Sequence, residues 1–142
     1  MKRALRFGLI ATGLIIALAA GVRADEKADE AAAQAVALGW LHEIDAGQYA
    51  KAWRQTAAPV KAAATADQFA GMMDVARKPL GAVTARKFQS ATFATSLPGA
   101  RPGKYVVVVY ATDFAGRRAA KEVITPMLEK DGRWRVSGYY IR

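Results

Sequence analysis

The sequence contains no cysteine among its 142 residues. A chain without cysteine forms no disulfide framework, and it offers no thiol for redox chemistry or nucleophilic attack. The same absence excludes a thiolate metal site and a lipid-attached N-terminal cysteine. The fold must therefore be held by the burial of apolar side chains.

Histidine is almost as scarce, because His42 is the only one in the chain. Metal sites need several converging ligands and commonly use more than one histidine, so we expect no metal and no cofactor. His42 stands beside Glu43 and near Asp45 but off the apolar stripe of the helix expected there. This favours a place on the helix surface over a role as one half of a proton-transfer pair.

Catalytic motifs are also missing. The chain has no glycine-rich phosphate loop, no serine-nucleophile elbow and no zinc-binding helix motif. Gly99 and Gly103 flank prolines in a loop, which is turn chemistry. Asp113 follows a valine-rich strand, where it would need an apolar pocket to act as a general base, and a turn aspartate before Gly116 is the favoured interpretation. We therefore assign no catalytic residue and lean towards a protein that is not an enzyme.

The first 24 residues have the three parts of a secretory signal. Lys2, Arg3 and Arg6 form a basic head, an uncharged and mostly apolar run spans residues 7–20, and Val22-Arg23-Ala24 ends it with small residues at the cleavage positions. The run is shorter than the roughly 20 apolar residues that a spanning helix needs. The sequence thus predicts a cleavable signal peptide over residues 1–24, a mature domain over 25–142 without a transmembrane segment, and a bacterial periplasmic or secreted location.

Negative charge is scarce in the second half of the chain. Residues 25–76 carry 4 basic and 8 acidic side chains, whereas residues 77–142 carry 13 basic and 4 acidic ones. Such asymmetry is typical of a cationic surface for an anionic partner, which for an exported protein would be an envelope component and not a nucleic acid. The alternative, favoured by the absence of a dense basic run, is a solvated sheet surface.

The mature chain begins with helical periodicity. After a polar and frayed stretch over 25–30, apolar residues recur at helical spacing up to about Ala46, where Gly47 suits the left-handed terminal position. A shorter helix follows from Tyr49, with Pro59 interrupting it and a further turn over 60–64 left open. Thr65 and Gln68 form the pattern of a capping box, which predicts a third helix that ends at Lys78-Pro79-Leu80-Gly81.

Beyond Gly81 the period changes from about 3.6 to 2. Strands are expected over 86–96, 105–110, 119–129 and 134–141, the second of them a central strand because its β-branched run is continuous. Pro126 implies a bulge or an edge position in the third strand, and Asp131-Gly132 marks a hairpin turn. Helices followed by strands predict an α+β fold, with three N-terminal helices packed on a four-stranded antiparallel sheet.

Three segments of the chain resemble a known bacterial family. Residues 45–49 with Trp53, the string 95–99, and above all the C-terminal string 123–141 are similar to domain-of-unknown-function family 4019, over roughly residues 31–141. The resemblance implies a nuclear-transport-factor-2-like or cystatin-like cone, in which a curved sheet wraps around helices. Because the family is uncharacterised, it supplies no activity and no catalytic residues.

The aromatic residues of such a cone are either core or the lining of a ligand pocket. The pocket interpretation names Tyr49, Trp53, Tyr110, Asp113 and Tyr139. Strict alternation in the last strand places Trp134, Val136 and Tyr140 on one face and Tyr139 on the other, so that one tyrosine faces away from the helices.

The sequence therefore predicts an exported, non-catalytic binding or interaction module. Its partner would be a small apolar ligand or a protein, with a homodimer through the sheet face as a further possibility. The alternative is a small pocket enzyme of isomerase or hydratase type that uses Asp113 or His42 with a tyrosine hydroxyl.

Overall fold

A computed structural model of the chain describes residues 12–142. The helices are α1 (Thr12–Asp45), α2 (Tyr49–Arg54), α3 (Ala58–Ala63) and α4 (Ala66–Arg77), followed by a 3-10 turn, η1 (Lys78–Leu80). The strands are β1 (Val83–Ala94), β2 (Tyr105–Phe114), β3 (Arg117–Leu128) and β4 (Trp134–Ile141). The α+β expectation is confirmed, with four α-helices in place of three because residues 58–63, with Pro59 in the first turn, form a short helix of their own.

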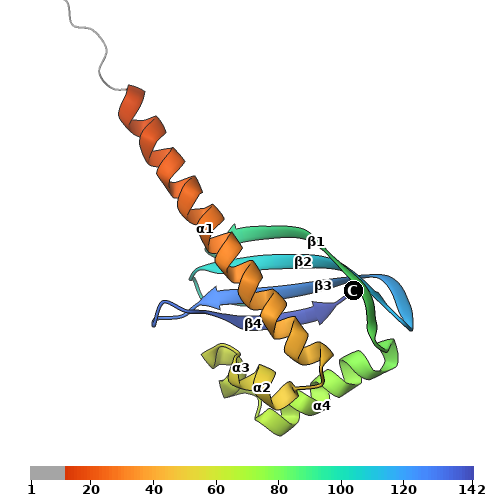
Figure 1. The fold of residues 1–142 in the computed structure, drawn as a ribbon. Coiled ribbons are helices and arrows are strands. Elements are labelled where there is room, and N and C mark those ends of the chain that lie inside the picture. The colour runs from red at the N-terminus through yellow and green to blue at the C-terminus, as the bar shows by residue number, and fades with distance from the viewer. Residues whose placement is uncertain (1–11) are drawn as a thin grey trace, which may run out of the picture.

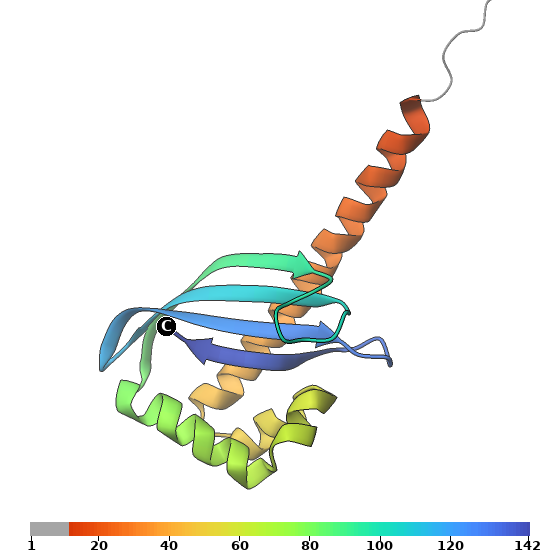
Figure 2. The same cartoon turned by 180° about the vertical axis from the view of Figure 1, so that it is seen from behind.

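The four strands form one antiparallel sheet in the order β1-β2-β3-β4. Helix α1 crosses one face of this sheet and contacts all four strands, while α2, α3 and α4 lie together below its lower edge (Figure 1). In the reverse view, no helix within residues 12–142 covers the opposite face, over which the β1–β2 loop extends (Figure 2). We call the face under α1 the inner face and the opposite one the outer face.

Helix α1 differs from the expectation at its start. Residues 25–30, expected to be frayed, are helical and continue α1 without a break. Glu30 accepts a hydrogen bond from the backbone N–H of Phe93 (3.0 Å), and Asp29 pairs with Lys104 (3.2 Å). These two contacts with the sheet stabilise the helical conformation of the polar stretch over residues 25–30. The basic head at Lys2, Arg3 and Arg6 lies outside the described residues.

The expected helix ends are confirmed. Gly47 adopts φ +70° after α1, the left-handed conformation in which glycine costs least. Thr65 accepts a hydrogen bond from the N–H of Gln68 (3.2 Å), and the Gln68 side chain accepts one from the N–H of Thr65 (2.9 Å). This capping box starts α4.

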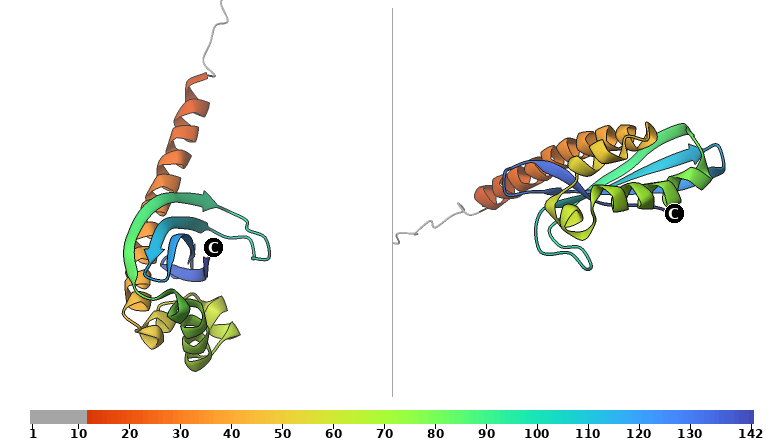
Figure 3. Two further views of the ribbon diagram at one scale, coloured as in Figure 1. Left: turned by 90° about the vertical axis from the view of Figure 1, so that its right-hand side faces the viewer. Right: turned by 90° about the horizontal axis from the view of Figure 1, so that it is seen from below.

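The sheet is curved (Figure 3), and bulges interrupt its register. One of them lies where Pro126 predicted it: Thr125 pairs with Gly138, but Pro126 pairs with Val136. Ser137 is therefore an extra residue in β4, and its insertion shifts the alternation of side chains beyond it. β2 is an interior strand, as its valine run predicted, and its inward side chains Val106 and Val108 are fully buried.

Candidate functional site

The inner face of the sheet carries a cluster of polar side chains that are mostly buried. We call it the buried polar cluster, and its members come from α1, α4 and all four strands: Asp45, Arg77, Arg86, Thr112, Glu122 and Tyr139. Glu122 is its centre and is fully buried. An isolated buried carboxylate would be very costly, so the contacts around it decide whether it is tolerated.

Glu122 is surrounded by donors. Its Oε1 accepts from Arg86 Nε (2.8 Å) and from the Thr112 hydroxyl (2.6 Å), and its Oε2 accepts from the Tyr139 hydroxyl (2.6 Å). The guanidinium of Arg77 lies 4.0 Å from Oε2. All three hydrogen bonds have the Glu122 carboxylate as acceptor in a buried setting, where hydrogen bonds are strongest.

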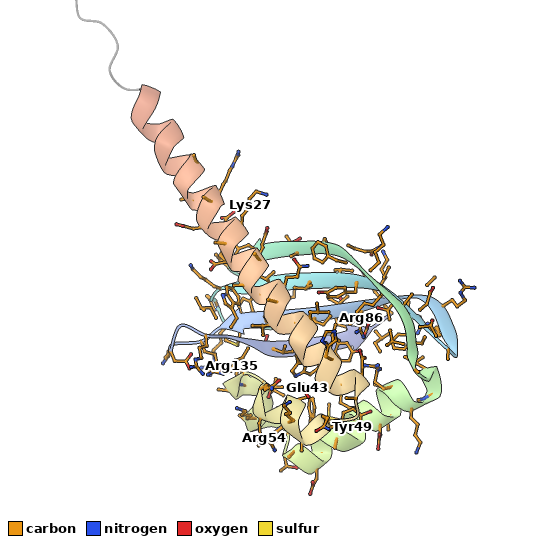
Figure 4. The ribbon with its side chains drawn as sticks, in the orientation of Figure 1. Lys27, Glu43, Tyr49, Arg54, Arg86 and Arg135 are labelled. Carbon is orange, nitrogen blue, oxygen red and sulfur yellow. The ribbon has the colours of Figure 1, made fainter. Side chains whose placement is uncertain are left out.

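The second carboxylate, Asp45, is held by two arginines at the end of α1. Arg77 Nη2 donates to its Oδ1 (2.7 Å), and Arg86 donates to both of its oxygens (2.6 and 3.0 Å). Figure 4 shows Arg86 reaching from the sheet towards the end of this helix. The cluster thus balances two cations against two anions, and Arg77 also lies over the ring of Phe114 (5.1 Å).

The cluster shifts the ionisation of its members. Burial raises the pKa of Asp45, but the hydrogen bonds and charges of Arg86 and Arg77 outweigh it and leave that pKa below its usual range. Burial raises the pKa of the Tyr139 hydroxyl, and the adjacent Glu122 raises it further, against a smaller opposite effect of Arg77. Tyr139 therefore stays protonated and keeps donating to Glu122.

Acid should remove the contribution of Asp45 to stability. Because its folded pKa lies below the unfolded value of about 3.9, this contribution is present above that value and is lost as the pH falls through the folded pKa. Chemical denaturation of the wild type and of Asp45→Asn should show a large stability gap at neutral pH that narrows below about pH 4. Asp74→Asn, at an exposed position of α4, is the control. A gap that stays constant with pH would contradict the assignment.

An apolar cleft of about 340 Å³ opens between α3, α4 and β4. Its position is set by the α2–α3 joint, where the N–H of Ala57 donates to the carbonyl of Val136 (2.8 Å) and Thr56 forms a parallel bridge with the same residue. The lining residues are Trp40, Thr56, Pro59, Val60, Ala63, Ala64, Phe69, Met72, Met73, Val136, Ser137, Gly138 and Tyr139. This volume lies near the lower end of the range of small-molecule sites, about 300–1,000 Å³.

Tyr139 joins the cleft to the buried polar cluster. Its ring packs edge-on against Trp40 (centroids 5.2 Å apart), and its hydroxyl is held by Glu122. The alternation predicted for β4 is wrong here: the bulge at Ser137 turns Tyr139 to the inner face with Val136, and Tyr140 to the outer face, where it is 53 % exposed. The prediction that one of the two tyrosines faces away from the helices is confirmed.

The other residues named for the pocket do not line this cleft. Tyr49 lines a separate small depression beside Asp45 and Arg77. Trp53 donates from its indole N–H to the carbonyl of Ala64 (2.9 Å), and Tyr110 is buried against Phe88. Asp113 accepts a hydrogen bond from the N–H of Ala119 (2.7 Å) beside the β2–β3 turn, as the turn interpretation predicted.

His42 is exposed on α1, which agrees with the surface interpretation. Within residues 12–142, no group of three or more histidine, aspartate or glutamate side chains could hold a metal ion. The arrangement offers ordered hydrogen bonding beside an apolar cleft.

The sequence reasoning missed Glu122, Arg77, Arg86 and Thr112. One pattern could have found two of them: Thr112 continues the inward series of Val106, Val108 and Tyr110 in β2, and Glu122 lies two residues before the buried Ile124 in β3. A charged residue in an inward series indicates a buried pair or a site, because burying it alone is so costly.

Comparison with models of known protein families finds a match that covers these features. A family model described as "Protein of unknown function (DUF4019)" matches residues 36–139, from the middle of α1 to Tyr139. The matched range includes every member of the buried polar cluster and the whole lining of the cleft. Searches of curated proteins and of solved structures found no match.

Proposed function

The chain belongs to domain-of-unknown-function family 4019, and we propose that it is an exported, non-catalytic module that binds a small apolar ligand in the cleft. The observation that carries the proposal is the cleft itself: its lining is mostly apolar, and Trp40, Phe69 and Tyr139 form an ordered aromatic floor. Pockets of this composition take apolar ligands and orient them with a few polar groups.

The rim of the cleft supports the same proposal. Met72, on the exposed side of α4, lines the cleft and is itself 58 % exposed, and Val75 one turn further on is 79 % exposed. Methionine adapts its shape at little cost, so it suits a rim that closes over ligands of varied outline. Exposed apolar residues that continue a cleft indicate a binding surface more often than isolated ones do.

The hydrogen bonds around Tyr139 favour binding over catalysis. Its hydroxyl donates to Glu122, and each Glu122 oxygen already accepts from this cluster. A general acid or base needs a proton or lone pair that is free for the substrate. The alternative of an isomerase or hydratase would have to use Tyr139 with Glu122, since Asp113 and His42 do not line the cleft. Turnover abolished by Tyr139→Phe would support that alternative.

A cleft-filling variant tests the proposal. Titration with the neutral probe N-phenyl-1-naphthylamine should enhance probe fluorescence and change the emission of Trp40, which lines the cleft. Ala63→Phe places a ring at the rim and should weaken binding at least about tenfold, a loss of about 1.4 kcal/mol. Ala62→Phe, on the same helix but outside the lining, is the matched control.

Two results would contradict the proposal: no binding of the probe by the wild type, or equal affinities for the two phenylalanine variants. Native mass spectrometry of protein purified gently from its source extends the test. A retained small molecule would name the ligand class directly.

Export is a separate part of the proposal. In α1, residues 19–25 are exposed, and the contacts with the sheet described above begin at Asp29 and Glu30. Removal of residues 1–24 would leave those contacts intact. Among the described residues no helix is both long enough and apolar enough to cross a membrane. Intact-mass measurement of protein recovered from the periplasm should give a chain that starts at Asp25; a mass that retains the first 24 residues would contradict it.

The homodimer through the outer face stays a prediction. Its support is the exposed ring of Tyr140 on a face that no described helix covers (Figure 2). The same native mass spectrum would give the oligomeric state. A dimer that persists after Tyr140→Ser would place the interface elsewhere.

A further inference from the structure

Three cations form a row across the outer face of the sheet. Lys87 of β1 pairs with Ala111 of β2, Ala111 pairs with Lys121 of β3, and Lys121 exchanges two backbone hydrogen bonds with Arg142 (2.7 and 2.9 Å). Residues directly opposite one another on neighbouring strands share a face. Because Ala111 lies between the inward Tyr110 and Thr112, this row, which we call the basic row, is on the outer face.

The basic row continues into the β2–β3 turn. Arg118 lies at the start of β3 on the same face, beside Asp113, and all four cations are exposed. Arg117 lies opposite the inward Phe114 and is not part of this surface. Of these four cations only Arg118 has an acidic partner within residues 12–142, Asp113 at 3.8 Å, and the Arg118 side chain is 87 % exposed. The row and Arg118 therefore bring four of the 13 basic side chains of residues 77–142 together on one face.

The neighbouring row on the same face is uncharged. Ser90 pairs with Val109, Val109 with Val123, and Val123 with Tyr140. Tyr140 is the exposed aromatic member of this row and lies two residues before Arg142 in the chain. Cations beside an amphipathic aromatic ring are typical of surfaces that lie on a membrane interface, because the ring enters the headgroup layer while the cations meet phosphates.

We propose that the basic row, with Arg118, docks this protein on the anionic phospholipid headgroups of a bilayer. The cations are spread out, with Lys87 and Lys121 about 10 Å apart because two strand spacings separate them. Such a strip suits a plane of many phosphates better than one small anion. Two copies packed through this row would bring like charges together, which disfavours a second copy as its occupant.

This surface is independent of the cleft. The cleft lies between α3, α4 and β4 and is lined by residues that pack towards the inner face, whereas the basic row lies on the outer face. A failure of lipid docking would leave the proposed ligand binding untouched, and the reverse also holds.

Vesicle co-sedimentation of the mature protein tests the proposal. Vesicles of equal parts phosphatidylcholine and phosphatidylglycerol should bind it at low salt, and vesicles of phosphatidylcholine alone should not. Each cation near an anionic surface strengthens binding about fivefold, so the triple variant Lys87→Gln, Lys121→Gln, Arg142→Gln should bind about one hundredfold more weakly. Binding of the wild type should also fall steeply as salt screens the charges.

The matched control removes the same charge from the helices. Lys27, Arg54 and Lys61 are exposed and make no ion pair within the described residues, and Lys27 and Arg54 lie on helices in Figure 4. Their triple glutamine variant should bind within about threefold of the wild type, because these cations do not lie in the basic row. A second variant, Arg118→Gln, which we call the turn variant, changes only the start of β3 and should bind about fivefold more weakly.

Three outcomes would overturn the proposal. These are no binding to the anionic vesicles, equal binding to both kinds of vesicle, and equal losses in the row variant and the helix control. If the circular dichroism spectrum shows that the row variant is unfolded, the turn variant is the deciding test. A decrease of less than about threefold in its vesicle affinity would then overturn the proposal.

Discussion

Glu122→Ala should destabilise the protein by about 3–5 kcal/mol, since removal of one partner leaves buried opposite charges without compensation. Arg86 would lose its Nε acceptor, while the hydroxyls of Thr112 and Tyr139 would lose the carboxylate to which both now donate. Glu122 is fully buried, so water cannot readily replace it. Guanidinium unfolding at neutral pH, followed by tryptophan fluorescence, measures the change.

The control for this prediction is a carboxylate on the surface. Glu43 pairs with Lys51 at 2.7 Å, and the lysine side chain is 49 % exposed. Glu43→Ala should cost less than about 1 kcal/mol, because exposed pairs gain little in water. If both variants lost the same stability, the interior around Glu122 would have to be far better hydrated than its burial indicates. The prediction concerns the cost of breaking the cluster and not its net contribution, which burial of the charges reduces.

Trp40→Ala should be about as damaging, with an expected loss of about 3–5 kcal/mol. Its side chain is 98 % buried, and its ring packs edge-on against both Phe69 and Tyr139. The indole N–H also donates to the carbonyl of Ala52 (3.1 Å), which ties α1 to α2. The variant also removes part of the aromatic floor of the cleft, so the affinity for N-phenyl-1-naphthylamine should fall as well.

Trp134→Ala is the matched control for Trp40. Trp134 is half-buried at the start of β4 and packs against the edge of the core. Its removal leaves a site that solvent can fill, so the expected loss is smaller, about 1–2 kcal/mol. Urea unfolding followed by circular dichroism compares both variants with no reliance on tryptophan emission. A loss for Trp134→Ala as large as that for Trp40→Ala would show that the floor of the cleft is not the more critical contact.

Local patterns predicted most of the secondary structure. Helical spacing in the residues around Trp40 and the β-branched run at Val106 each specify one kind of element, since only one periodicity buries their apolar side chains. The capping box at Thr65 and the left-handed Gly47 mark helix ends by chemistry within a few residues. These features form as the sequence predicts because their partners are close in the chain.

The candidate site could be predicted only in small part. Tyr139 was named for the pocket but placed on the face opposite Val136, because the bulge at Ser137 depends on the pairing of β4 with Pro126 and its neighbours in β3. That Met72 and Met73 line a cleft was also not predicted, because it depends on the docking of α4 near β4. Both errors concern the packing of elements that are distant in sequence.

By itself the sequence determined the family, the α+β class and the excess of positive charge in the second half of the chain. These properties are sums or short-range patterns, and they do not depend on how the elements pack. The tertiary structure alone decided that Asp45, Arg77, Arg86 and Glu122 meet, and that Lys87, Lys121 and Arg142 stand in one row. Register and helix docking bring these groups together from up to 77 positions apart, and electrostatic interactions act only where the folded chain places charges close together.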